Sequence, residues 1–189
     1  MPGRCRRCWV MERWCICADI PKIDNRTEVL VLRHLLESRK STNTARIAAL
    51  ALRRMEIVDV DARRPPDIAG WLASKGKVWL VFPGGTTADV EHERPDAVLL
   101  VDGTWKQARK MVRSHGALLA LPRLSLPGGD PAVWRLRTTK LRDAQSSMEA
   151  IAEALRIVES SAHAEALHRL HQLHVARVLL ARGAIPTRD

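Results

Sequence analysis

The chain has 189 residues, 46% of them hydrophobic and 28% charged, which suffices for one folded domain and excludes a mainly disordered chain. Its net charge of +10 favours a polyanionic partner, with nucleic acid as the first candidate. Tyrosine is absent and phenylalanine occurs once, which argues against an RNA-recognition sheet with Tyr and Phe platforms.

Short apolar runs alternate with helical patterns along the chain. The expected strands are 29–36, 57–60, 78–82, 97–101 and 133–137. The expected helices are 45–55, 65–71, 105–113, 146–158 and 163–180. This alternation predicts an α/β fold with a mainly parallel sheet, and the all-apolar strands are typical of burial on both faces. We expect two parts, a cysteine-rich segment at 1–26 and a main domain at 27–189.

No apolar run reaches the length of about 18 residues that a membrane span needs, so we expect no membrane association. The first residues, MPGRCRRCWVMERWC, lack the apolar stretch of a secretory signal. We therefore expect a cytoplasmic protein whose cysteines stay reduced. The sequence gives no sign of an obligate protein partner.

All four cysteines lie near the start of the chain, at Cys5, Cys8, Cys15 and Cys17, in the pattern C-x2-C-x6-C-x-C. Four thiolates this close in sequence can surround one tetrahedral zinc ion, which would offset the cost of ordering so small a segment. Such a site is structural, because four protein ligands leave no open position on the metal. The alternative is four unligated cysteines.

Positive charge is concentrated between Thr104 and Arg142, where nine basic residues face one acid, a net charge of +8. A charge run is usually a solvated surface, but one this free of acidic partners favours a phosphate-binding surface. The candidate RNA-binding residues are Lys106, Arg109, Lys110, Arg113 and Lys140 here, with Lys40, Asn43 and Arg46 upstream.

Two expected strands end in loops of small and polar residues, at 82–85 and 101–105. Because ligands of parallel α/β sheets bind beyond the carboxyl ends of the strands, these loops are candidate ligand contacts. Asp102 stands where an acid can take part in chemistry, although the local pattern alone favours an N-cap or turn residue for the following helix. The histidines between His163 and His174 lack acidic or cysteine neighbours, so we expect them to line a helix surface.

Five motifs in order resemble the DTW-domain family, the tRNA-uridine aminocarboxypropyltransferases. The run Asp102-Gly103-Thr104-Trp105, followed by KQARKM, matches the motif for which the family is named. The four cysteines resemble the zinc knuckle of bacterial members, and HLLESRKSTNTAR at 34–46 resembles an H-x-x-E…TNT-x-R block. The loop at 81–84 has Phe82 where the family usually has Tyr. The run at 135–150 resembles a block ending in S-T-x-E-A, with Ser147 in place of the Thr.

The resemblance implies a fold related to the SPOUT methyltransferases, with a deep trefoil knot and a catalytic domain at 27–189. It implies S-adenosylmethionine as donor of a 3-amino-3-carboxypropyl group to a uridine in tRNA, which forms acp3U and leaves methylthioadenosine. Asp102 would then accept the imide proton or orient the donor. The donor-binding residues implied are Phe82, Pro83, Gly84, Gly103, Thr104, Trp105, Leu136, Arg137, Ser147 and Glu149.

Two alternatives stay open at this point. A SPOUT-type RNA methyltransferase would release S-adenosylhomocysteine in place of methylthioadenosine. A non-catalytic, zinc-dependent RNA-binding protein would keep every function when Asp102 is changed.

Overall fold

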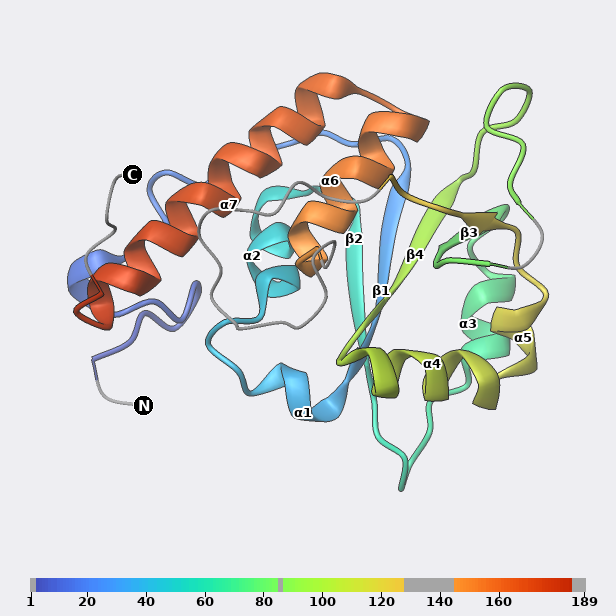
Figure 1. Ribbon diagram of the computed structural model, residues 1–189, viewed down its shortest axis with the longest axis horizontal. Helices are drawn as coiled ribbons and strands as arrows, with labels where there is room; N and C mark the ends of the chain where they lie inside the picture. The colour runs from blue at the N-terminus through green and yellow to red at the C-terminus, as the bar shows by residue number, and fades with distance from the viewer. Residues whose placement is uncertain (1–2, 85–86, 128–144, 185–189) are drawn as a thin grey trace.

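The computed structural model describes residues 3–84, 87–127 and 145–184. Its centre is a five-stranded sheet in the order β2-β1-β4-β3-β5, in which every pair of neighbouring strands is parallel (Figure 1). The strands are β1 (Glu28–His34), β2 (Met55–Val60), β3 (Val78–Val81), β4 (Ala97–Asp102) and β5 (Arg123–Leu124). The prediction of an α/β fold with a parallel sheet is confirmed.

Helices cover both faces of this sheet, as Figure 1 shows. One face packs against α2 (Thr44–Ala51), α6 (Ser147–Val158) and α7 (Ser161–Ala181). The other packs against α3 (Ile68–Ala73), α4 (Trp105–Ser114) and α5 (Gly116–Leu119). A short helix, α1 (Leu35–Ser38), follows β1, and a single 3-10 turn, η1 (Glu12–Trp14), lies in the N-terminal segment. Alternate residues of β1 to β4 enter the two cores, as the pleat of a strand requires.

Several element bounds differ from the predictions, and α1, α5 and β5 were not predicted. Two of the shifted ends have a clear cause in the structure. The first strand ends at His34 rather than at residue 36, because the His34 ring accepts a hydrogen bond from the backbone N–H of Leu36 and so caps α1. Helix α2 ends at Ala51 rather than at residue 55, because the Asn25 side chain bonds the backbone of Arg54 through both its oxygen and its nitrogen. These contacts hold the chain extended where local sequence favours a helix.

The N-terminal segment shares the core of the sheet. Cys8, Val10 and Ile16 are buried together with side chains of β1, α2, α6 and α7. In the part of the chain that is described, no helix is both long and apolar enough to span a membrane. The expected strand at 133–137 and the residues Leu136, Arg137 and Lys140 lie outside the described residues. The described residues do not show the expected knot.

Candidate functional site

A cavity of about 260 Å³ lies beyond the carboxyl ends of β3 and β4, between the first turns of α4 and α6. This is the edge at which parallel sheets bind ligands. Its walls are Val81, Phe82, Pro83, Leu100, Val101, Asp102, Gly103, Trp105, Ala108, Leu124, Ser125, Leu126, Pro127, Gln145, Ser146, Ser147 and Ala150. Apolar walls with a few convergent polar groups are typical of small-molecule sites.

Asp102 is the acidic residue of this cavity. It ends β4 on the same face as Val98 and Leu100, and its side chain therefore points toward α2 and α6 with 8% of its surface exposed. Asn43 Nδ2 donates to its Oδ2 and Ser147 Oγ donates to its Oδ1, each at 2.5 Å. Donors from two other segments thus fix both carboxylate oxygens, and each oxygen has the lone pairs to accept one more hydrogen bond.

Asn43 joins Asp102 to the neighbouring elements. Its Oδ1 accepts from the backbone N–H of Arg46 at 3.1 Å, which caps α2, and from Arg33 Nη1 at 3.4 Å. Arg33 also holds Asp59 through two hydrogen bonds of 2.7 and 3.1 Å. A line of polar contacts therefore crosses the carboxyl edge of the sheet from β2 to α6. Sequence analysis missed Arg33, although a lone charge in an otherwise apolar strand was a signal for it.

The three residues after Asp102 shape the rim of the cavity. A side chain on Gly103 would meet Gln107 at 3.2 Å, so this close approach favours glycine. Thr104 is the N-cap of α4, with its hydroxyl accepting from Gln107 N–H and its own N–H bound by the Gln107 side chain. The alternative in which Asp102 caps this helix is therefore wrong. Trp105 opens the helix at the cavity and leaves 42% of its surface exposed.

Two neighbouring aromatic rings at this rim are each approached by a guanidinium group. The rings of Trp105 and Phe82 lie 6.0 Å apart, the Arg109 guanidinium lies 5.8 Å from the Trp105 ring, and Arg123 lies 5.6 Å from the Phe82 ring. Arg123 is 6% exposed, its burial lowers its pKa, and its Nε and Nη1 have no hydrogen-bond partner among the described residues. The sequence analysis counted Arg123 among the nine basic residues of the 104–142 segment, but the structure buries it. Gly84, with φ of +73°, makes the turn that follows Phe82 and Pro83.

The first turn of α6 supplies the opposite wall. Ser146 caps the helix and Ser147 points at Asp102, and both line the cavity. Glu149, an expected donor contact, instead accepts from Ser146 N–H at 2.7 Å, and it is not among the described residues that line the cavity. The Ser146 hydroxyl lies 3.1 Å from His171 Nε2 on α7.

His171 and His174 are buried between α7 and the core, so the prediction that the C-terminal histidines line a helix surface is wrong for these two. Burial lowers the pKa of both, that of His174 to about 4 with a smaller contribution from His171. His168 and His163 lie nearer the surface, beside Glu153 and Glu159.

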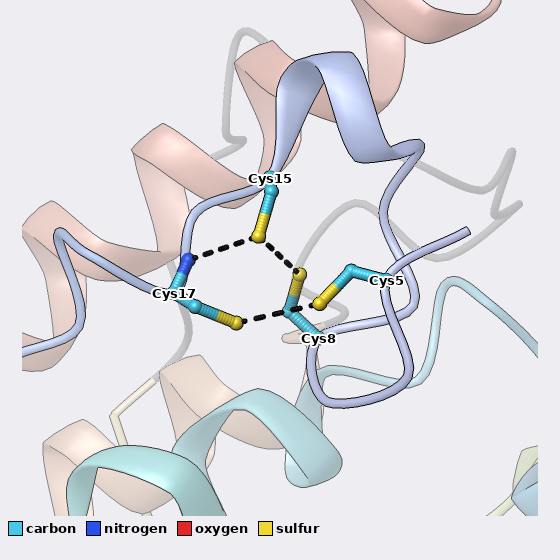
Figure 2. A group of neighbouring side chains, drawn as sticks. All are labelled: Cys5, Cys8, Cys15 and Cys17. Atoms are coloured by element: carbon cyan, nitrogen blue, oxygen red, sulfur yellow. Dashed lines mark hydrogen bonds between the residues drawn. The ribbon is translucent and has the colours of Figure 1, made fainter. Parts of the chain in front are cut away.

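The four cysteines converge on one point, as Figure 2 shows. Their sulfur atoms all lie within 4.8 Å of one another, with Cys5 to Cys17 at 3.6 Å and Cys8 to Cys15 at 3.8 Å. A tetrahedral zinc ion with bonds of about 2.3 Å to sulfur holds its ligand sulfurs about 3.8 Å apart. The cluster therefore fits a four-coordinate metal ion.

The pKa values of the thiols differ within the cluster. Backbone N–H groups of Cys8 and Arg7 lower the pKa of Cys5 to about 6, whereas burial, then the neighbouring sulfurs, raises the pKa of Cys17 to about 12. Burial also raises the pKa of Cys8. Four thiolates at these separations need a positive charge between them, which a bound metal supplies.

The expected RNA-binding residues divide into two groups. Helix α4 buries Ala108, Met111 and Val112. Its exposed basic residues are Lys106, Arg109, Lys110 and Arg113. The upstream group differs, because Asn43 is buried against Asp102 and Arg46 stacks on Trp9 at 3.5 Å. Lys40 is exposed and pairs with the buried Glu37 at 2.5 Å.

Comparisons with known proteins agree with the motif order. A family model described as the DTW domain matches residues 3–179. The chain is also 27% identical, over 170 residues, to tRNA-uridine aminocarboxypropyltransferase 2 of Drosophila melanogaster, covering 84% of this chain and 67% of that protein. No solved structure gives a significant match. Since the family model spans nearly the whole chain, this protein belongs to the DTW-domain family.

Proposed function

We propose that this protein transfers the 3-amino-3-carboxypropyl group of S-adenosylmethionine to a uridine in tRNA, forming acp3U. One observation carries the proposal: the aspartate of the DTW motif is held by two donors inside a cavity, and a basic helix starts at the rim of that cavity. The named relative is a distant one, and the family supplies the reaction class.

The cavity suits the donor substrate in character. Its apolar walls can take the adenosine, and the serines at its ends can bond polar groups of the amino acid moiety. Phe82, Pro83, Gly103, Trp105 and Ser147 are the expected donor contacts that line it. S-Adenosylmethionine supplies a carbon that its sulfonium has already activated, so the chain must supply alignment and a proton acceptor.

Asp102 is our candidate for that acceptor. Transfer joins uracil N3 to the activated carbon, breaks the carbon–sulfur bond, and releases the N3 proton together with methylthioadenosine. The hydrogen bonds from Asn43 and Ser147 would keep the carboxylate of Asp102 in one orientation while it takes the proton. In a second role that the geometry also permits, the carboxylate would balance positive charge on the donor.

The exposed face of α4 is our candidate for the tRNA contact. Four basic side chains on one helix can neutralise phosphates along a strand that approaches the rim. The four cysteines do not line the cavity, and we propose that they hold zinc in a structural role.

The decisive experiment incubates the protein with tRNA and S-adenosylmethionine and identifies nucleosides and by-products by mass spectrometry. We expect acp3U and methylthioadenosine in equal amounts. Methylated nucleosides with S-adenosylhomocysteine would instead indicate a methyltransferase, and tRNA binding without any product would indicate a binding protein.

The role of Asp102 is tested with Asp102→Asn, and with Asp67→Asn as a matched control. Asp67 lies on the exposed surface outside the cavity, so this control measures the effect of the same substitution away from the site. If Asp102 accepts the proton, the single-turnover rate falls roughly 10² to 10⁴-fold with unchanged donor affinity. If it balances charge, donor affinity by calorimetry falls too. A fully active Asp102→Asn protein would remove the catalytic assignment.

A further inference from the structure

The shortest cation–π contact among the described residues joins the cysteine knuckle, the segment 5–17, to α2. The Arg46 guanidinium lies 3.5 Å from the centre of the Trp9 ring, compared with 5.6 to 5.8 Å for the other pairs. Trp9 directly follows Cys8, and Arg46 lies in the first turn of α2. The contact therefore connects the cluster of sulfurs to the helix whose N-cap, Asn43, holds Asp102.

The knuckle sets the position of Trp9. The Trp9 backbone has φ of +62°, the left-handed region that a bulky residue enters only where its surroundings require it. Its N–H donates to the Cys5 carbonyl at 3.0 Å, and its carbonyl accepts from Arg4 at 2.9 Å. One candidate metal ligand, Cys8, directly precedes Trp9, and another, Cys5, accepts its backbone hydrogen bond. The positions of these two cysteines therefore determine where the Trp9 backbone, and with it the ring, lies.

Arg46 connects the Trp9 ring to Asn43, the residue that bonds Asp102. Its side chain donates to the carbonyl of Ser38, at the end of α1, and its backbone N–H donates to Asn43 Oδ1. Its Nε is buried and has no hydrogen-bond partner among the described residues, so the Trp9 ring and the Ser38 carbonyl are the contacts that fix the guanidinium. Such a side chain is poorly placed to bind phosphate, which argues against the RNA-binding role expected from sequence.

We propose that Trp9 and Arg46 are positioning residues, through which the metal-bound knuckle holds the first turn of α2 and so the Asn43 amide against Asp102. In this arrangement the metal supports the site as well as the fold. The effect on turnover rests on the proposed function, whereas the effect on the Asn43 hydrogen bond does not.

The chain offers a direct probe of that hydrogen bond, because Asn25 and Asn43 are its only asparagines. Selective ¹⁵N-asparagine labelling of the full, metal-loaded protein gives side-chain amide signals from these two residues. Asn25 serves as the internal control, since it is buried and bonded to the carbonyls of Thr27 and Arg54, away from Asp102. Replacement of Asn43 by Ser assigns the signals.

Three variants break or keep the contact. Trp9→Ala removes the ring, Arg46→Met keeps the aliphatic stem without the charge, and Trp9→Phe keeps an aromatic face. Trp14→Ala is the matched control, because Trp14 lies in the same knuckle but faces Arg177 on α7. Metal content per chain is measured for every variant.

We expect Trp9→Ala and Arg46→Met to retain one metal ion, to shift the Asn43 amide signals, and to speed their hydrogen exchange about tenfold or more. The Asn25 signals stay in place, and Trp9→Phe and Trp14→Ala resemble the parent protein. Removing the metal moves the Asn43 signals in the parent, with little further change in Arg46→Met. If the proposed transferase activity is found, its single-turnover rate falls roughly ten- to a hundredfold in the first two variants at unchanged donor affinity, and Trp9→Phe restores it.

Unchanged Asn43 signals in both Trp9→Ala and Arg46→Met overturn the proposal, whatever the activity. So does an equal movement of the Asn25 signals, which would mean general loosening of the fold. Weaker tRNA binding by Arg46→Met with an undisturbed Asn43 would identify Arg46 as an RNA contact instead. If the transferase activity is not found, the Asn43 signals of the variants still test the positioning role of Trp9 and Arg46.

Discussion

His174 makes the stability of this protein depend on pH in a calculable way. The ring is fully buried on α7, and neither nitrogen has a hydrogen-bond partner among the described residues. Burial, aided by His171, lowers its pKa from 6.5 to about 4. Below pH 6.5 the imidazole becomes protonated in the unfolded chain, whereas in the folded protein it stays neutral down to about pH 4. The free energy of unfolding therefore falls as the pH falls from 6.5 to about 4. At 1.36 kcal/mol per pKa unit the full loss is about 3 kcal/mol, of which about 2 kcal/mol is reached by pH 5.

The assay compares urea unfolding of the parent protein and His174→Leu at pH 7 and pH 5. At pH 7 we expect the variant to be more stable by about 1 kcal/mol, because it no longer buries two unpaired nitrogens. The advantage of the variant should widen by about 2 kcal/mol at pH 5, whereas His171 titrates in both proteins and largely cancels. His92→Leu, at an exposed histidine, is the control. An advantage that is the same at both pH values refutes the reasoning.

Three further predictions concern Ser147, the basic face of α4 and the cysteine cluster. Ser147→Ala removes one of the two donors to Asp102 and should slow single turnover roughly tenfold, with Ser147→Thr retaining activity in the same assay. Charge reversal of Arg109 and Arg113 to Glu should weaken tRNA binding far more than donor binding and lower the salt dependence of binding by about 1.5 to 2 in log–log slope; equal loss of both ligands would speak against a tRNA contact. Metal analysis should find about one zinc per chain, lost on replacing Cys15 and Cys17 with Ser; metal-free parent protein, purified without chelator, would contradict this.

Four of the five described strands were predictable because each contains a short apolar run, whereas β5, of two residues, was not predicted. Runs such as VWLV and AVLLV are buried on both faces, and this composition distinguishes a parallel α/β sheet from an amphipathic one. The element ends were less predictable, since His34 and Asn25 set them by contacts that local propensity does not contain. The cysteine cluster was predictable for a different reason, because four ligands within a few residues can meet without long-range folding.

The partners of Asp102 were beyond sequence reasoning. Asn43 and Ser147 are 59 and 45 residues away in the chain, and each carries a second, local role as the cap or first residue of a helix. An asparagine in a Ser/Thr-rich turn is normally exposed, so the same residue type suits an RNA contact or a buried clamp equally well. The contact of Arg46 with Trp9 was likewise beyond sequence reasoning, because Trp9 lies in a different part of the chain.

The histidines show a related limit. Residues 168, 171 and 174 share a helical face by their spacing, but spacing does not say whether that face meets solvent or protein. Helix α7 packs on α6 and on the N-terminal segment together, so it buries a broader face than one neighbour would require.

The DTW motif divides its tasks in a way that accounts for its order. In most helices that follow a strand, the acid of the loop would be the N-cap, and Ser or Asn could replace it. Here Thr104 takes that task together with Gln107, which leaves the Asp102 carboxylate free for the cavity. Strand alternation then fixes its position, since a shift to residue 101 or 103 would turn the acid toward the core with α4 and away from Asn43 and Ser147. The acid must therefore be the last residue of β4, and the cap must follow two residues later.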